Sequence, residues 1–133
     1  MAYEGPQIAV PGLKASADLS AKQFYFVKLS GVATVTACDA ATDEPLGVLQ
    51  NAPASGAAAN VCSIGITKLS SNAAITAGAL IGTSADGQAD PKIWGTDKTE
   101  YIVGRAITTS GAADGIVTCL INCAVPVLAV TSA

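Results

Sequence analysis

Short apolar runs broken by turn-forming residues constrain the fold of this chain more than any other feature of its sequence. The clearest run ends the chain's main part, where alternate residues are apolar: Val117, Cys119, Ile121, Cys123 and Val125. Successive side chains of a strand point to opposite faces, so this spacing predicts a strand with one wholly apolar face. The segment 115–125 is therefore expected to line a core.

Similar runs, rich in β-branched or aromatic residues and bounded by Gly, Pro, Asn, Asp or Ser, recur at 23–29, 32–38, 45–49, 58–69, 79–82 and 101–107. The first two predict a hairpin, and 101–107 with 115–125 predict another. In the segment 58–69, period two places Cys62, Ile64 and Ile66 on one face. About seven or eight short strands without an amphipathic helix predict an all-β fold, either a small β-barrel or a β-sandwich.

The two ends of the chain differ from this β domain, which is predicted to span residues 21–125. Residues 1–20 contain Pro6 and Pro11 and few large apolar side chains, so they predict an extended N-terminal arm. The C-terminal tail, 126–133, is short but apolar and is expected to dock on this chain or on a neighbour. The segment 90–100 is charged and predicts a surface loop with Trp94 as its aromatic anchor.

Charged residues make up only 13% of the chain, against about 25% in an ordinary domain, so much of the surface is expected to serve contacts. Seven basic residues are scattered along a chain of net charge −3, which argues against nucleic-acid binding. No apolar run reaches the length of a membrane span, and the first residues do not resemble a signal peptide. We expect a soluble protein, made in the cytoplasm, with no membrane partner.

The residue types argue against catalysis and against a cofactor. The chain has no histidine, the usual general base and partner of a Ser or Cys nucleophile. The acidic residues of 39–44 and 86–97 lack the order of a calcium loop and are expected to be solvated turn residues. The segment 78–83 lacks the Gly-Lys-Ser/Thr of a phosphate-binding loop. Trp94 and Tyr101 are expected to pack against protein instead of stacking on a base or sugar.

The cysteines do not predict a metal site. No Cys-x-x-Cys pair occurs, and most of the cysteines fall inside predicted strands: Cys38, Cys62, Cys119 and Cys123. In a reducing compartment such residues behave as small buried hydrophobes. We therefore expect four buried free thiols, and we expect neither a bound metal nor any enzymatic activity.

The order of these features resembles that of the small capsid cement, or head decoration, proteins of tailed bacteriophages. The resemblance covers about residues 5–125, and it rests on the Pro-rich start followed by these segments: 24–29, 45–49, 62–66, 75–81, 84–89 and 103–106. Each piece is short and rich in Gly and Ala, so the resemblance lies in their order and spacing.

The resemblance implies a structural protein on the capsid exterior of the virion, binding the outside of an expanded head and stabilising contacts between capsomers. Its implied partners are the major capsid protein and further copies of itself, with a homotrimer favoured over a dimer. An arm with unpaired backbone groups can add a strand to another subunit's sheet. We therefore predict that Tyr3, Gln7, Ile8 and Val10 bind the capsid, and that subunit contacts involve Trp94, Val127, Leu128 and Val130.

Two other functions fit the same pattern. A small β-barrel could enclose an apolar ligand in its aliphatic interior. Another virion module, from a tail or a fibre, would share the composition and is expected to form an elongated trimer. An enzyme is the weakest alternative, because no convergent polar group of residues is visible.

Overall fold

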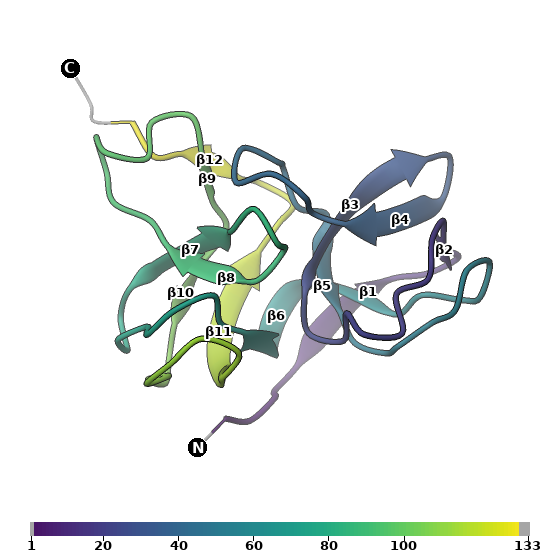
Figure 1. Ribbon diagram of the computed structural model, residues 1–133, viewed down its shortest axis with the longest axis horizontal. Coiled ribbons are helices and arrows are strands. Elements are labelled where there is room, and N and C mark those ends of the chain that lie inside the picture. Colours follow the sequence, from purple (N-terminus) through teal and green to yellow (C-terminus); the bar gives the residue numbers. More distant parts are fainter. Residues whose placement is uncertain (1, 131–133) are drawn as a thin grey trace.

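The computed structural model describes residues 2–130, which contain strands but no helix (Figure 1). This confirms the predicted all-β class. The strands outnumber the seven or eight expected because several are only two or three residues long. All the strands of the described residues are β1 (Gln7–Val10), β2 (Lys14–Ala15), β3 (Phe26–Gly31), β4 (Thr34–Ala37), β5 (Gly47–Leu49), β6 (Val61–Ser70), β7 (Leu80–Thr83), β8 (Ala89–Pro91), β9 (Tyr101–Ile102), β10 (Gly104–Ala106), β11 (Ile116–Asn122) and β12 (Val127–Leu128).

Most strands belong to one ten-stranded sheet, with the order β2-β4-β3-β5-β6-β11-β10-β7-β8 and with β1 paired to β6. Every pair is antiparallel except β2 and β4, and both predicted hairpins form, as β3–β4 and β10–β11. A single bridge between Ser71 and Ala89 brings β8 back beside the end of β6. Strands β9 and β12 make a separate two-stranded ribbon.

Two clusters of buried side chains lie on opposite faces of the central strands. The larger cluster contains Phe26, Cys38, Val48, Cys62, Leu69, Ile75, Ile81, Ala89, Val103, Ala106, Val117, Cys119, Ile121 and Cys123. The smaller cluster contains Leu13, Ala15, Leu19, Val27, Val35, Leu49, Ala59 and Val61. Strands β3, β5 and β6 give adjacent residues to the two clusters, so both faces of these strands are buried at those residues.

The predicted face of the last long strand is confirmed over most of its length. In β11 the buried residues are Val117, Cys119 and Ile121, and Cys123 follows directly after the strand. Val125 was expected on the same face, but it is 68% exposed. The alternation cannot extend that far because the strand ends at Asn122.

The predicted face of 58–69 is wrong at Cys62. In the pairing of β1 with β6, Ile8 lies opposite Ile64, and the next residue, Ala9, lies opposite Cys62. Ser63 is therefore an extra residue in β6. Such a bulge shifts the alternation by one residue. Cys62 therefore lies in the larger core, whereas Ile64 and Ile66 lie on the outer face of the sheet, opposite Asn122 and Leu120 of β11.

The segment predicted to be an extended N-terminal arm packs on the rest of the chain. Residues of β1 pair with β6, and Leu13, Ala15 and Leu19 are buried in the smaller cluster. At the other end of the chain, β12 pairs with β9 and includes part of the predicted tail. Met1 and residues 131–133 lie outside the described residues.

Candidate interaction surfaces

The first residues form a strap, here defined as residues 2–10, that is anchored by hydrogen bonds. The backbone N–H of Tyr3 donates to Thr118 Oγ1 (2.6 Å), and the same hydroxyl donates to the carbonyl of Tyr3 (2.8 Å). The N–H of Gly5 donates to the carbonyl of Ile66 (3.0 Å), and the N–H of Ile66 donates to that of Pro6 (3.1 Å). Thr118 is fully buried, so the strap both covers and satisfies its hydroxyl.

The strap can lie this close to β6 because residue 65 is a glycine. Gly65 has φ +140°, in a region that other residues rarely adopt, and a Cβ there would lie 2.3 Å from the carbonyl oxygen of Pro6. A larger residue would push the strap away from the sheet. Gly65 therefore fixes the path of the strap.

Four strap residues were predicted to bind a capsid, and three of them are exposed: Tyr3, Gln7 and Ile8. Tyr3 is 48% exposed and Ile8 is 62% exposed. Gln7 Nε2 donates to Gln50 Oε1 (3.3 Å) and to a carbonyl of β6, while Val10 packs against the smaller cluster. The backbone is not free on both sides, since one edge of β1 pairs with β6; its other edge has no backbone partner among the described residues.

The C-terminal end forms a second surface around the β9–β12 ribbon. Val127 pairs with Ile102, and Leu128 pairs with Tyr101. Ala129 is fully buried, its N–H donates to the carbonyl of Glu100 (3.0 Å), and its carbonyl accepts from the N–H of Gly95 (2.8 Å). These bonds bring the Trp94 loop and the predicted tail together, at the end of the molecule where Figure 1 places β9 and β12.

Lys92 fixes the base of this loop from inside the fold. Its side chain is fully buried, and its Nζ donates to the carbonyl of Thr83 (2.8 Å), to Asp90 Oδ2 (3.0 Å) and to Glu100 Oε1. Three acceptors match the three protons of an ammonium group. Sequence reasoning missed this residue, because a lysine within a charged segment is typical of an exposed loop.

Six large apolar side chains are exposed around the ribbon, and we call them the C-terminal surface. Four were predicted to make subunit contacts, and they are 38 to 48% exposed: Trp94, Val127, Leu128 and Val130. The other two, Ile93 at 61% and Val125 at 68%, were not predicted as contacts. Large exposed apolar side chains that lie near one another are typical of a binding site.

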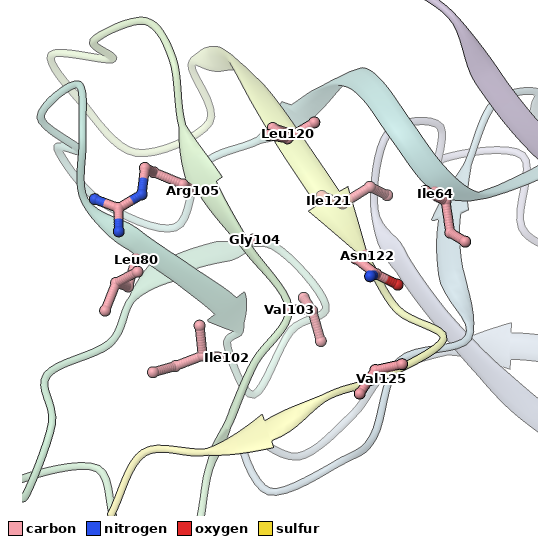
Figure 2. Close-up of a pocket in the computed structure, with 10 residues that line it drawn as sticks. All are labelled: Ile64, Leu80, Ile102, Val103, Gly104, Arg105, Leu120, Ile121, Asn122 and Val125. Carbon is pink, nitrogen blue, oxygen red and sulfur yellow. The ribbon is translucent and has the colours of Figure 1, made fainter. Parts of the chain in front are cut away.

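An apolar hollow of about 460 Å³ lies beside this surface, on the outer face of the sheet (Figure 2). Ile64, Leu80, Leu120 and Val125 line it, together with residues of β9 and β10. Its one charged group, Arg105, donates from Nη1 to the carbonyl of Gly78 (2.9 Å). A ligand-binding barrel would hold its ligand inside, whereas this hollow is outside and the larger cluster is filled by fully buried side chains.

The four cysteines have raised pKa values, which suit a structural role better than a reactive one. Burial raises the pKa of Cys62 to about 11 and the pKa values of Cys38 and Cys119 to about 12, and it also raises the pKa of Cys123. All four cysteines are buried, as predicted, and they are free thiols. Thiols held in the protonated form are poor nucleophiles and poor metal ligands.

A small ion network lies at the turn after β4. Lys28 Nζ is 2.7 Å from Asp39 Oδ1 and 2.9 Å from Asp43 Oδ2. Burial works to raise the pKa of Asp43, but hydrogen bonds from Lys28 and from the N–H groups of Asp39 and Ala40 outweigh it and lower the pKa. Residues 2–130 contain no group of His, Cys, Asp and Glu that could hold a metal ion, and no helix there could cross a membrane.

Together, these observations define an all-β protein with exposed apolar side chains on the strap and on the C-terminal surface. No protein-family model and no curated protein matches the sequence. Among solved structures, the chain is similar to the N base of head fiber gp8.5 from bacteriophage phi29, with a TM-score of 0.65 and 16% identity. The match covers 89% of this chain and 96% of the other. At this identity the similarity shows a shared fold.

Proposed function

We propose that this protein is a structural part of a bacteriophage virion that binds the outer surface of an expanded head and stabilises contacts between capsomers. The proposal is carried by the fold match, which spans nearly the whole of a domain described as the base of a phage head fiber. A fold does not determine function by itself. The surfaces of this chain supply the further support.

The edge strands of this protein are of two kinds. Edges of the main sheet are protected: β2 carries Lys14, and β8 carries Asp90 and Pro91, residues that discourage pairing with another chain. Strand β1 has no charge, has a free edge, and exposes Ile8. An uncharged free edge suits strand addition, in which backbone hydrogen bonds give affinity and alternate side chains give specificity.

We therefore propose that the capsid subunit adds a strand to β1, beside Ile8. This differs from the insertion of a free arm, because one edge of β1 already pairs with β6. The strap would stay in place and present its second edge. Repetition of this contact over one head would allow weak individual contacts to sum to a large stabilisation.

The test is co-sedimentation of the purified protein with heads of its source phage that lack it, both before and after expansion. We expect saturable binding to expanded heads only. A positive charge at the proposed contact, Ile8→Arg, should weaken binding by more than about tenfold, as for an interface hot spot. The matched control is Val32→Arg, since Val32 is 97% exposed in the turn between β3 and β4.

The outcomes separate the parts of the proposal. Absence of binding to either kind of head would contradict the decoration function. Binding that is equally strong for wild type and Ile8→Arg would retain that function but reject β1 as the contact. If Val32→Arg alone reduces binding, the contact lies at the turn between β3 and β4.

A second candidate, the base of a head fibre, is favoured by the similarity of fold to the N base of a phage head fiber. A fibre base and a decoration protein would both occupy the head exterior, but a fibre base carries an elongated projection. Negative-stain images of decorated heads distinguish them. Projections on heads that carry the native gene product would favour the fibre, and a smooth added layer would favour decoration.

A further inference from the structure

We propose that the cluster of Lys92, Glu100 and Asp90 is a self-modification site, at which Lys92 Nζ forms an amide (isopeptide) bond with the side chain of Glu100 while Asp90 moves a proton. This inference goes beyond the proposed function, because it concerns the covalent structure of the chain and does not require a head. It rests on the positions of the three groups, on the burial of the amine, and on the backbone contacts that hold the reacting residues.

The first argument is position. Lys92 Nζ donates to Glu100 Oε1 and to Asp90 Oδ2 (3.0 Å), and its third acceptor is the carbonyl of Thr83 (2.8 Å). A nucleophile held beside its target reacts within one molecule, and good orientation can be equivalent to an effective concentration of about 10⁵ M or more. The contacts therefore supply the main requirement for a bond between Lys92 and Glu100.

The second argument is burial. The side chain of Lys92 is 0% exposed, whereas the side chains of Glu100 and Asp90 are 21% and 28% exposed. Holding an ammonium group away from water carries a large desolvation cost, which a neutral amide avoids. The amide removes the opposite charges of Lys92 and Glu100, and its N–H keeps the carbonyl of Thr83 as an acceptor. Asp90 is exposed enough for water to solvate its carboxylate after the reaction.

The third argument is that backbone contacts hold both reacting residues. The N–H of Lys92, directly after β8, donates to a carbonyl of β7 (2.8 Å), and the carbonyl of Glu100, directly before β9, accepts from the N–H of Ala129 (3.0 Å). In β7, a Cβ at Gly82 would lie 2.8 Å from Lys92 Cε and 2.1 Å from the carbonyl oxygen of Tyr101. A glycine at residue 82 therefore leaves room for both the lysine side chain and the start of β9.

The reaction balances within these three groups. Asp90 accepts one proton from the ammonium group of Lys92, and the free amine attacks Cδ of Glu100. The new C–N bond forms and one C–O bond of the Glu100 carboxyl group breaks. The departing oxygen leaves as water with two protons from Lys92, one of them returned by Asp90. The products are an amide, one water molecule and the Asp90 carboxylate, so no oxidant or co-reactant is required.

The first measurement is the intact mass of the full chain, purified in its folded state. The mass should be lower than that of the sequence by one water molecule. Trypsin cleaves after unmodified Lys and Arg, so it should not cut after an acylated Lys92. It should instead release one branched peptide, in which residues 69–98 are joined to residues 99–105 through Lys92 and Glu100.

Two variants and a matched control test the assigned roles. Lys92→Arg keeps a positive charge, but its guanidinium stays protonated and is a poor nucleophile, so the variant should have the unmodified mass. Asp90→Asn keeps the shape of the side chain but cannot accept the proton, so the branched peptide should form more than about tenfold more slowly. Asp97→Asn is the control: Asp97 lies in the same loop and accepts from the N–H of Ile93, so this variant should react like the native chain.

A native chain of unmodified mass, with no branched peptide after prolonged incubation of the folded protein, would overturn the proposal and leave Lys92 as the centre of an ion pair. Loss of water at Asp86 or Asp114, where an Asp-Gly sequence can form a succinimide, would overturn it as well. Trypsin would in that case still cut after Lys92.

The remaining outcomes test the separate roles. A linear peptide 69–98 that has lost water and is not cut after Lys92 would mean a bond to Asp90 and would reject Glu100 as the partner. Branched peptide formed at the native rate in Asp90→Asn would reject Asp90 as the proton carrier. Circular dichroism establishes that each variant is folded, and if one is not, the mass and the peptide map of the native chain decide.

Discussion

The two core clusters of this protein differ in how the chain builds them. The larger one is lined by regular strands, among them β7, β10 and β11, and it contains all four cysteines. The smaller one has no cysteine and is closed by less regular segments that carry Leu13, Leu19 and Ala59. Strands β3, β5 and β6 belong to both. The comparison suggests that two chemically different cores depend on one shared set of strands.

The largest effect that should separate the clusters is alkaline pH. Buried thiols keep raised pKa values in the folded state, whereas in the unfolded chain they ionise near their ordinary value of 9.0. Their contribution is complete below pH 9 and is lost as pH rises toward the folded-state pKa, which is about 11 for Cys62 and about 12 for Cys38 and Cys119. Between pH 9 and 11, each thiol should lower the free energy of unfolding by about 1.4 kcal/mol per pH unit, and the four together by about 5 kcal/mol per pH unit.

Urea unfolding at pH 7, 9 and 10 in the presence of a reductant measures this loss. Replacing one thiol, as in Cys119→Ala, should reduce the slope of stability against pH by about one quarter. Leu49→Ala, which alters only the smaller cluster, should lower stability equally at every pH. Constant stability between pH 9 and 10 would show that the thiols are not buried as described.

The next effect in size is the loss of a core leucine from either cluster. Leu69 in the larger cluster and Leu49 in the smaller one are both fully buried, so Leu69→Ala and Leu49→Ala should each cost about 2 to 5 kcal/mol. Because β6 carries Leu69 and is also part of the smaller cluster through Val61, both variants should unfold in one transition. Unfolding followed by circular dichroism and by Trp94 fluorescence measures this.

Two separate transitions would contradict the shared framework. The shared framework would also be contradicted if hydrogen exchange in Leu49→Ala accelerated around Val35 but remained unchanged around Val117. A single transition with accelerated exchange in both regions would establish that the two clusters fold as one unit.

The contrast between regular and irregular segments also explains what could be predicted from the sequence. In β11, regular alternation was enough to identify Val117, Cys119 and Ile121 as core residues, because a strand without interruption obeys period two. In β6 the extra residue Ser63 reversed the face of Cys62, and the local signal of a bulge, the isolated Gly65 two residues further along the strand, does not give its position. Bulges depend on pairing with other strands, which local sequence does not reveal.

The surfaces divide in a similar way. Trp94, Val127, Leu128 and Val130 were predicted as contacts from their apolar character and from the resemblance to decoration proteins, and the structure places them near one end. The burial of Lys92 could not be predicted, because its acceptors come from three separate positions along the chain. The docking of the strap was missed for a related reason, since Tyr3 and Thr118 lie 115 residues apart.

The smallest effect concerns the strap, which runs from the outer face of β11 to the smaller cluster. Tyr3 is held by Thr118 of β11, whose side chain points away from Val117 and Cys119, while Val10 packs against the smaller cluster. Thr118→Val keeps the shape of the side chain but removes the hydroxyl that satisfies the backbone of Tyr3. It should lower the free energy of unfolding by about 1 to 2 kcal/mol.

Hydrogen exchange distinguishes a local effect of Thr118→Val from a global one. The N–H of Gly5, which donates to Ile66, should exchange faster in the variant, while amides of β1 that pair with β6 near Val61 should keep most of their protection. Thr108→Val is the matched control, because it removes a hydroxyl that binds the N–H of Thr118 without contacting the strap. Equal acceleration at Gly5 in both variants would mean that the strap follows the stability of β11 as a whole and is not anchored by Thr118.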